Sequence, residues 1–442
     1  MLTNAREVSV EVLGKVLYQG AYSNIALDNA FSSASLKDED TALVTEITYG
    51  TLKYLITIDM ILERNMTISL KKVERDVLNI LRISIYQMKY LDRIPSYAVI
   101  NEAVNLTKKY SQKASGFVNG VLRGYLRKEG ETYAFKDALL EDSFTYSFPL
   151  WMVKLFREQY GATYRKILEG LNERPSVTYR VNTLKMDREE ALKVLESLGY
   201  HAHKTMISPY GIEVRGGKSV MENRLFREGA LTVQDESSML VAPALFEGSA
   251  RSYMDLCSAP GGKATGIAEL TGDKVPVYAF DIYENKLKLI RENKNRLGTT
   301  SIRPMMNDAK TFLPDFRGTS NVLLDAPCSG LGIIRKKPEI KYAKEQKDLS
   351  SLVLLQREIL SVARQYVREE GLLVYSTCTL NKNENEENAR WFLQENSEFE
   401  AYPLDLGKAE NLIYTKEGFV TILPGNTMDG FFIARFRRKP GK

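Results

Sequence analysis

Two cysteines and one aspartate follow short apolar runs of this 442-residue chain. Asp325 and Cys328 come just after the run at 321–324, and Cys378 comes after the run at 372–375 and a Ser-Thr pair. Short apolar runs between turn signals predict buried parallel strands. Open α/β sheets bind their ligands at the carboxyl ends of such strands. We therefore predict that an acid and two thiols meet at one edge of a sheet and form a reaction centre.

The loop that carries the first thiol is expected to be short and rigid. Pro327 cannot continue a central strand, and the Ser329-Gly330 pair favours a sharp turn. A lone cysteine is often only a small buried hydrophobic residue. Two cysteines at strand ends beside an acid favour a catalytic interpretation instead.

Composition limits the class of protein. The chain is 44% hydrophobic and 26% charged, which is typical of a globular protein with an ample core. Its formal net charge of +5 excludes a polycationic nucleic-acid coat, although a local basic surface can still exist. No apolar run approaches the roughly 20 residues of a membrane span. The charged residues among the first twenty exclude a secretory signal.

The cysteine and histidine content points in the same direction. The three cysteines are far apart and form no C-x-x-C pair, so neither a disulfide framework nor a zinc site is expected. The only histidines, His201 and His203, lie in a polar stretch that predicts a solvated turn. We therefore expect a reduced, cytoplasmic protein without a metal and without a membrane anchor.

Hydrophobic periodicity divides the chain into three parts. Residues 1–140 show helical periodicity almost throughout, with an irregular stretch from 131, and predict an all-α domain. Residues 141–232 mix strand and helix patterns and predict a small α/β subdomain. Residues 233–442 alternate strands with helices, which predicts a mostly parallel, doubly wound sheet. A final pair of strands, separated by a Pro-Gly-Asn turn, is expected to form an antiparallel hairpin at the sheet edge.

The elements expected in the last part place the reactive residues. The predicted strands are Tyr253–Cys257, Val275–Asp281, Ile302–Asn307, Asn321–Asp325, Leu372–Tyr375, Gly418–Leu423 and Phe431–Arg437. The predicted helices are Lys263–Leu270, Asn285–Leu297, Leu349–Val367 and Glu384–Leu393.

A glycine-containing loop after the first of these strands predicts a ligand site. Gly261 and Gly262 allow a ligand to approach the backbone, and the following helix N-terminus favours negative charge. The spacing matches neither G-x-G-x-x-G nor the P-loop, so a dinucleotide or a nucleoside triphosphate is not indicated. Asp281 ends the next strand, 20 residues after Gly261, where nucleoside-binding sheets hold ribose hydroxyls. Asp308 ends the third strand and could accept from an adenine amine, so a nucleoside without a triphosphate fits best.

The motifs of this last part, taken in order, resemble those of the RNA (cytosine-5) methyltransferases. The matching segments are Gln234–Ser238, Cys257–Lys263, Asp281, Asp308, Asp325–Gly330, Ser376–Thr379 and Asp429–Phe432. The helical front resembles the NusB-type domain of the bacterial Fmu/Sun (RsmB) branch, which methylates 16S ribosomal RNA. The segments that carry this likeness are Gly20–Asn24 and Thr48–Thr51. One departure is Ala264, where threonine is common in the family.

The resemblance implies a Rossmann-like, class I methyltransferase domain that uses S-adenosyl-L-methionine. It implies that the cofactor is held by the glycine loop and the strand-end acids, namely Cys257, Ser258, Ala259, Pro260, Gly261, Gly262, Lys263, Asp281, Asp308 and Asp325. It also implies that Cys378 is the nucleophile. In the related DNA enzymes the cysteine of a Pro-Cys motif attacks instead, so Cys328 is a rival.

The chemistry of cytosine gives each of these residues an expected role. Carbon 5 is a poor nucleophile until a thiolate adds to carbon 6, which is covalent catalysis. We expect Cys378 to attack and Cys328 to assist elimination. Asp325 can hydrogen-bond the ring, and nearby Lys263 can help to ionise the attacking thiol.

The basic run Arg335, Lys336 and Lys337, just past the Cys328 loop, is interpreted as an RNA contact, with a solvated loop as the alternative. The expected partner is 16S ribosomal RNA, naked or in a partly assembled small subunit, and the expected oligomeric state is a monomer. Two other functions stay open: the same chemistry on transfer RNA or 23S RNA, and a non-catalytic ribosome-assembly factor on a methyltransferase fold. The sequence does not decide whether the helical domain binds RNA or protein.

Overall fold

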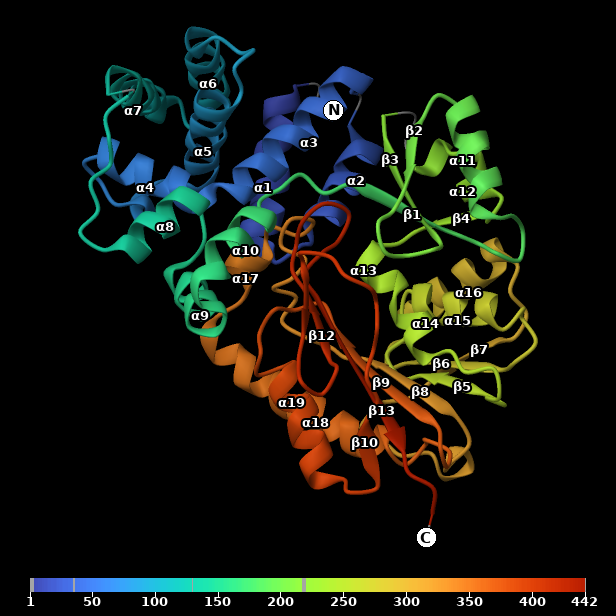
Figure 1. Cartoon of the computed structure of the whole chain (residues 1–442). Coiled ribbons are helices and arrows are strands. Elements are labelled where there is room, and N and C mark those ends of the chain that lie inside the picture. The colour runs from blue at the N-terminus through green and yellow to red at the C-terminus, as the bar shows by residue number, and fades with distance from the viewer. Residues whose placement is uncertain (1–3, 35, 129, 217–219, 442) are drawn as a thin grey trace. The chain divides into compact units, whose positions relative to one another are not determined.

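The computed structural model describes residues 4–34, 36–128, 130–216 and 220–441. Two compact units are present (Figure 1). The first contains residues up to Asn172 together with Ile334–Gln346, and the second contains Glu173–Ile333 and Lys347–Lys442. The three-part division expected from the sequence stays a prediction as to its boundaries. Within the described residues, no helix is both long and apolar enough to cross a membrane.

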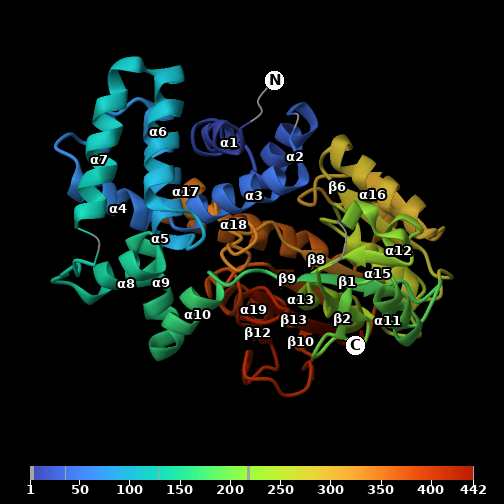
Figure 2. The same ribbon diagram turned by 90° about the horizontal axis from the view of Figure 1, so that it is seen from above.

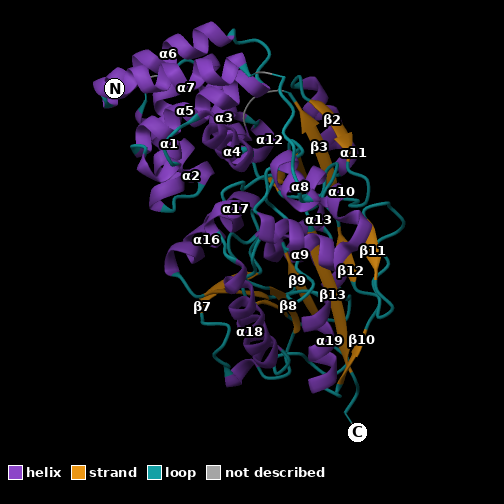
Figure 3. Ribbon diagram, turned by 90° about the vertical axis from the view of Figure 1, so that its left-hand side faces the viewer, coloured by secondary structure: helices purple, strands orange, loops and turns teal. Residues whose placement is uncertain are grey.

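The first unit is helical, and none of its described residues forms a strand (Figure 3). Its helices are α1 (Ala5–Gln19), α2 (Ser23–Ser33), α3 (Asp38–Lys53), α4 (Leu55–Asn65), α5 (Arg75–Tyr90), α6 (Ser96–Tyr110), α7 (Ser115–Arg127), α8 (Ala138–Tyr146), α9 (Leu150–Tyr160), α10 (Tyr164–Gly170) and α17 (Ile340–Ala343). Asn4 Oδ1 caps α1 by accepting from Arg6 N at 2.8 Å, and Val8, Val12 and Val16 bury one face of that helix. Helices α6 and α7 run side by side (Figure 2).

Two sequence-based expectations for this unit need correction. The helical periodicity expected before residue 131 is interrupted between α3 and α4, because the backbone leaves helical geometry at Tyr54. The stretch from 131 that was expected to be irregular contains α8, which is capped by Asp137. Short helices with few periodic apolar positions give a weak sequence signal.

The first part of the second unit is a four-stranded antiparallel sheet. Its strands are β1 (Val177–Val181), β2 (His201–Lys204), β3 (Gly211–Arg215) and β4 (Leu231–Val233), in the order β2-β3-β1-β4. Helices α11 (Arg188–Ser197) and α12 (Arg224–Arg227) accompany it. The polar turn expected at His201 and His203 is wrong, because these residues form β2, whose side chains alternate and leave both histidines exposed. An edge strand with polar residues on one face carries little hydrophobic pattern.

The rest of the second unit is built on a nine-stranded sheet. Its strands are β5 (Tyr253–Asp255), β6 (Val277–Asp281), β7 (Ile302–Met306), β8 (Asn321–Asp325), β9 (Leu372–Thr377), β10 (Phe399–Ala401), β11 (Leu412–Tyr414), β12 (Val420–Ile422) and β13 (Phe431–Arg438). The order is β11-β12-β13-β9-β8-β5-β6-β7, and β10 pairs with β13. Strands β5 to β9 are parallel, and the remaining pairs are antiparallel.

Helices cover both faces of this sheet, as the doubly wound prediction requires. They are α13 (Glu236–Met239), α14 (Val241–Leu245), α15 (Gly262–Leu270), α16 (Glu284–Leu297), α18 (Gln346–Ala363) and α19 (Glu386–Glu395). Leu323 and Val374 pack with α14 to α16, whereas Val322, Leu324 and Leu373 pack with α18 and α19. The predicted hairpin β12–β13 is confirmed, but β13 lies inside the sheet beside β9, and β11 is the edge strand.

Candidate active site

The carboxyl ends of β8 and β9 lie side by side, with Asp325 opposite Ser376. The Asp325 carboxylate accepts from Lys263 Nζ at 2.6 Å and from Ser376 Oγ at 2.8 Å. Burial lowers the pKa of Lys263, but the charge and hydrogen bond of Asp325 outweigh it, so the net shift is upward. A cation and an anion are therefore held together at the strand ends, as expected from the sequence.

The two predicted thiols meet at this edge. Cys328 Sγ lies 3.2 Å from Cys378 Sγ, although 50 residues separate them along the chain. The hydrogen bond with Cys378 raises the pKa of Cys328, and burial raises it further. Both effects oppose ionisation of the Cys328 thiol.

Backbone contacts hold the loops around the thiols. Gly332 N donates to Cys378 O at 3.0 Å, and Gly430 N donates to Gly332 O at 2.9 Å. A Cβ on Gly332 would lie 1.9 Å from Gly430 O, so only glycine fits there. Phe431, next to Gly430, places its ring 5.5 Å from Lys263 Nζ. The segment 429–432 that resembled a closing motif thus borders the reaction centre.

The glycine loop follows β5, whose neighbours in the sheet are β6 and β8. Gly261 adopts a φ of +97°, which favours glycine, and begins α15 as its N-cap. The loop residues predicted to bind the cofactor, Cys257 to Lys263, are mostly buried or half-buried around this turn. Burial raises the pKa of the Cys257 thiol, with further upward effects from Asp255 and Asp325.

The predicted ribose and adenine acids lie at the ends of the next strands. Asp281 ends β6 and accepts from Tyr283 N at 3.3 Å, and it is 6% exposed. Asp308 lies just beyond β7, is half-buried and accepts from Lys310 N at 3.0 Å. Large apolar side chains, Ile282 and Met306, stand 46% and 66% exposed beside them. Carboxylates next to exposed apolar side chains fit a ligand that has both hydroxyls and a flat base.

Asp255 is a site residue that sequence reasoning missed. It ends β5, is 1% exposed, and burial raises its pKa to about 7, with Asp325 acting in the same direction and Lys263 against it. No hydrogen bond of ordinary geometry reaches its Oδ1 or Ser258 Oγ among the described residues, although the Ser258 hydroxyl and the Cys257 N–H are close enough to lower the pKa of Asp255. Buried polar atoms without partners indicate a place for ligand atoms. The sequence signal that could have identified Asp255 is its position as a strand-end acid two residues before Cys257.

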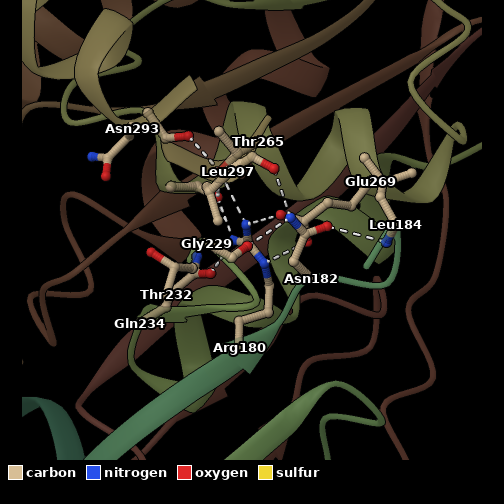
Figure 4. A network of polar contacts seen from close by, with 12 residues as sticks. Arg180, Asn182, Leu184, Gly229, Thr232, Gln234, Thr265, Glu269, Asn293 and Leu297 are labelled. Carbon is tan, nitrogen blue, oxygen red and sulfur yellow. Dashed lines mark hydrogen bonds and ion pairs between the residues drawn. The ribbon is translucent and has the colours of Figure 1, made fainter. Parts of the chain in front are cut away.

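Arg180 is a second missed residue, and it connects the small sheet to α15, the helix that follows the glycine loop (Figure 4). It is 3% exposed on β1 and forms a two-pronged ion pair with Glu269 of α15, at 3.0 and 2.7 Å. Its Nη1 also donates to Gly262 O at 2.5 Å and to the Gln234 side chain. Burial raises the pKa of Glu269, and Arg180 opposes that shift. The arginine therefore fixes the backbone of the loop predicted to bind the cofactor.

The basic run predicted as an RNA contact begins the segment that belongs to the helical unit. Arg335 is only 7% exposed, Lys336 is half-buried, and Lys337 places its Nζ 5.2 Å from the Tyr22 ring centre. The RNA contact stays a prediction for these residues.

Models of known protein families match three parts of the chain. The family described as 16S rRNA methyltransferase RsmB/F matches residues 244–437. The NusB family matches residues 3–127, and the ferredoxin-like domain of RsmF/B-like methyltransferases matches residues 148–221. The predicted fold class is thereby confirmed: a NusB-like front, a small α/β subdomain, which the match describes as ferredoxin-like, and a methyltransferase domain.

Individual relatives are similar over the whole chain. A probable ribosomal RNA small subunit methyltransferase B of Bacillus subtilis (strain 168) is 37% identical over 99% of both chains. A probable protein of the same name from Synechocystis sp. is 33% identical over 99% of this chain and 100% of its own. The crystal structure of PH0851 superposes with a TM-score of 0.83 at 25% identity, covering 99% of this chain and 100% of that one.

The fold and the family match define a methyltransferase of the class I type. More specifically, the chain belongs to the RsmB/F family of ribosomal RNA methyltransferases.

Proposed function

We propose that this protein transfers a methyl group from S-adenosyl-L-methionine to carbon 5 of a cytosine in 16S ribosomal RNA. The reaction proceeds through a covalent bond between Cys378 Sγ and carbon 6 of the base. Relatives named small subunit methyltransferase B support the choice of the 16S molecule. The target base must leave its stack, at a cost of a few kcal/mol that is lowest in single-stranded loops.

One observation carries the proposal. Two sulfur atoms lie 3.2 Å apart beside the Lys263–Asp325 pair, at the carboxyl ends of adjacent strands. A reaction that needs only one nucleophile has no use for a second thiol at this distance. A reaction that adds a thiolate and later eliminates it does, because a proton must be moved at the same base.

The chain's own residues then have defined tasks. Addition of the Cys378 thiolate to carbon 6 makes carbon 5 electron-rich, so carbon 5 can accept a methyl group. Asp325 hydrogen-bonds the ring, and the Lys263 ammonium offsets the negative charge that gathers around the thiolate. The carbon-5 proton then passes to water, the bond between Cys378 Sγ and carbon 6 breaks, and the aromatic ring is restored. Cys328 assists this elimination by giving its proton to the departing Cys378 sulfur, and it regains a proton from water.

The residues present fit the cofactor. Asp281 and Asp308 would bond its ribose and adenine, and the Cys257–Lys263 loop would approach its amino-acid part. Unpartnered Asp255 Oδ1 and Ser258 Oγ are consistent with polar ligand atoms at this loop. S-adenosyl-L-methionine supplies an electrophilic methyl group when it is bound.

Two single variants test the roles of the thiols. RNA from cells that lack the enzyme is incubated with cofactor labelled in its methyl group. Cys378→Ala should abolish label transfer and form no protein–RNA adduct, since the attacking atom is gone. Cys328→Ala should accumulate an adduct that survives a denaturing gel, since elimination is slowed.

The double variant Cys328→Ala/Cys378→Ala is the matched control and should form no adduct. An adduct in Cys378→Ala but not in Cys328→Ala would reverse the assignment. Label that maps to a base other than a cytosine of 16S RNA would contradict the proposed substrate.

A further inference from the structure

A buried carboxylate lies behind the two thiols and takes no part in the mechanism above. Glu384 is 0% exposed and lies in the turn that leads from β9 to α19. Its Oε2 accepts from Ser329 N and from Gln356 Nε2, both at 2.9 Å. Its Oε1 accepts from Ser329 Oγ at 2.6 Å and from Asn381 Nδ2 at 3.1 Å. A charged carboxylate that is buried away from water needs hydrogen-bond donors, and four donors compensate here for its lost hydration.

Two of the four donors belong to the loop that carries Cys328. Ser329 follows Cys328 directly and gives both its backbone N–H and its hydroxyl to Glu384. Gln356 Nε2 also donates to Pro327 O, on the other side of Cys328, at 2.9 Å. The peptide groups before and after Cys328 are thus held by one connected set of hydrogen bonds.

The same set extends to the loop that carries Cys378. Ser329 Oγ lies 2.7 Å from Thr379 Oγ1, and Thr379 follows Cys378 directly. Asn385, the residue after Glu384, donates from its Nδ2 to Thr379 O at 2.9 Å. A change at Glu384 must therefore shift one thiol loop relative to the other.

The amide of Gln356 is itself oriented. Its Oε1 accepts from Asn388 Nδ2 at 2.8 Å, so its Nε2 must point to Glu384 and Pro327. Asn388 in turn accepts from Arg357 Nε at 2.8 Å. A network whose members are all satisfied specifies one arrangement and resists displacement.

We propose that Glu384 is a positioning residue, whose carboxylate sets the spacing of the Cys328 and Cys378 loops and so the balance between thiol addition and elimination. The roles of the two thiols rest on the proposed function, whereas the effect on their spacing does not. The charge of Glu384 also adds to the upward shift of the Cys328 pKa that Cys378 and burial cause. It therefore helps to keep Cys328 protonated while Cys378 attacks.

The spacing can be measured without RNA or cofactor. Dibromobimane becomes fluorescent when it bridges two neighbouring thiols, and a Cys257→Ser background leaves only the pair of interest. We expect Glu384→Ala to slow bridging by at least about tenfold, because loops that lose their fixed positions seldom present both thiols together. Glu384→Gln should bridge within about threefold of the parent, since it can keep its bonds to Ser329 N and Gln356 if Asn381 turns its amide.

Activity gives a second readout that a general loss of stability would not produce. Glu384→Ala should lower kcat by about 10²-fold, the effect of a displacement of roughly 1 Å, while KM for RNA changes little. Glu384→Gln should restore most of kcat. Glu387→Ala, three residues further on and paired with Arg390 at the surface, is the matched control and should behave like the parent.

If Glu384→Ala does not fold, Thr379→Val replaces it. This variant removes the hydroxyl that contacts Ser329 Oγ and that accepts from Asn381 N at 3.3 Å, and it keeps all four groups that donate to Glu384. It should slow bridging less than Glu384→Ala would, but measurably.

Bridging at the parental rate in Glu384→Ala, or in Thr379→Val where that variant is used, would overturn the positioning role. So would a Glu384→Gln variant as slow as Glu384→Ala. Slower bridging in Glu384→Ala, together with no RNA adduct in Cys328→Ala, would leave the positioning role standing and reject the proposed function instead.

Discussion

Two lysines of this protein lose most of their contact with water, and their surroundings shift their pKa values in opposite directions. Lys263, at the site in the second unit, is 14% exposed and bonds the Asp325 carboxylate at 2.6 Å. Lys341, on α17 in the helical unit, is 2% exposed and bonds only neutral oxygens. Burial lowers the pKa of Lys341 well below its usual value, whereas Asp325 raises that of Lys263.

The partners of Lys341 nevertheless suit an ammonium group. Its Nζ donates to Lys53 O at 3.0 Å, to Ser147 O at 2.9 Å and to Asn172 Oδ1 at 3.0 Å. Three acceptors match the three N–H groups of the charged form, and the Phe148 ring centre lies 3.7 Å away. A neutral amine would leave one acceptor without a donor.

The difference between the two sites separates a reactive role from a structural one. Lys263 bonds the Asp325 carboxylate at the strand ends, and under the proposed function its charge is available to a developing thiolate. Lys341 fastens the 334–346 segment into the helical unit, as do its neighbours: Glu339 accepts from Ser23 Oγ at 2.8 Å, and Tyr342 OH donates to Leu52 O at 2.6 Å. Removing each charge should therefore damage a different property.

The largest effect is expected from Lys263→Met. Without the ammonium, the thiolate loses its nearby cation, and methyl transfer should fall by about 10²–10³-fold, as for other electrostatic groups in active sites. The free energy of unfolding should change far less. Single-turnover transfer of labelled methyl groups and urea unfolding measure the two effects.

The matched control is Lys288→Met, an exposed lysine of α16 whose partner Glu292 lies at 3.9 Å. It should stay within about 0.5 kcal/mol of the parent in stability and keep its rate. A Lys263→Met protein with parental rate would remove the electrostatic role of Lys263.

The next largest effect is expected from Lys341→Met, and it is an effect on stability. Methionine fills similar space, but three buried acceptors lose their donor at a cost of about 1–3 kcal/mol each. Relief from burying a charge offsets part of this, so the free energy of unfolding of the helical unit should fall by about 2–4 kcal/mol.

The unfolding transition of the helical unit in urea measures this loss of stability. The methyl-transfer rates of parent and variant are compared at a temperature at which the variant stays folded. Lys109→Met, which breaks a surface pair with Glu7, is the control and should cost no more than about 1 kcal/mol. A larger fall in rate for Lys341→Met than for Lys263→Met would invert the comparison.

The reactive strand ends show which features of the structure the sequence could predict. Strand β8 occurs at Asn321–Asp325 as predicted, and Asp325, Cys328 and Cys378 meet as expected. Apolar runs of four or five residues identify parallel strands, and all parallel strand ends share one edge. Local pattern and simple topology were therefore enough to assemble the reaction centre.

The features that the sequence did not predict depend on contacts between residues that are distant in the chain. The Arg180–Glu269 pair spans 89 residues, and the Glu384 donors come from three separate segments. Charged residues near Lys341 suggested a solvent-facing basic surface, although Lys341 itself is buried. The sequence around a single charged residue does not indicate whether that residue is buried, because its burial depends on acceptors supplied by other elements.

The smallest effect, and the one that tests the opposite shifts directly, is on the pH dependence of stability. A lowered pKa means that unfolded Lys341 binds more protons than folded Lys341 below its usual value of 10.5. Its contribution to the free energy of unfolding should therefore rise with pH towards 10.5, by at most about 1.4 kcal/mol per unit. The raised pKa of Lys263 has the reverse consequence: its contribution is complete below 10.5 and is lost only above it.

Urea unfolding between about pH 7 and pH 10 separates the two lysines. The difference between parent and Lys341→Met cancels the contributions of buried thiols and tyrosines, which both proteins share. That difference should grow as pH rises, because the parent gains stability when its buried lysine loses its charge, whereas Lys341→Met has no such group. For Lys263→Met the difference should stay constant over the same range. Parallel curves for Lys341→Met would mean that its three acceptors and the Phe148 ring fully compensate the burial of the ammonium group.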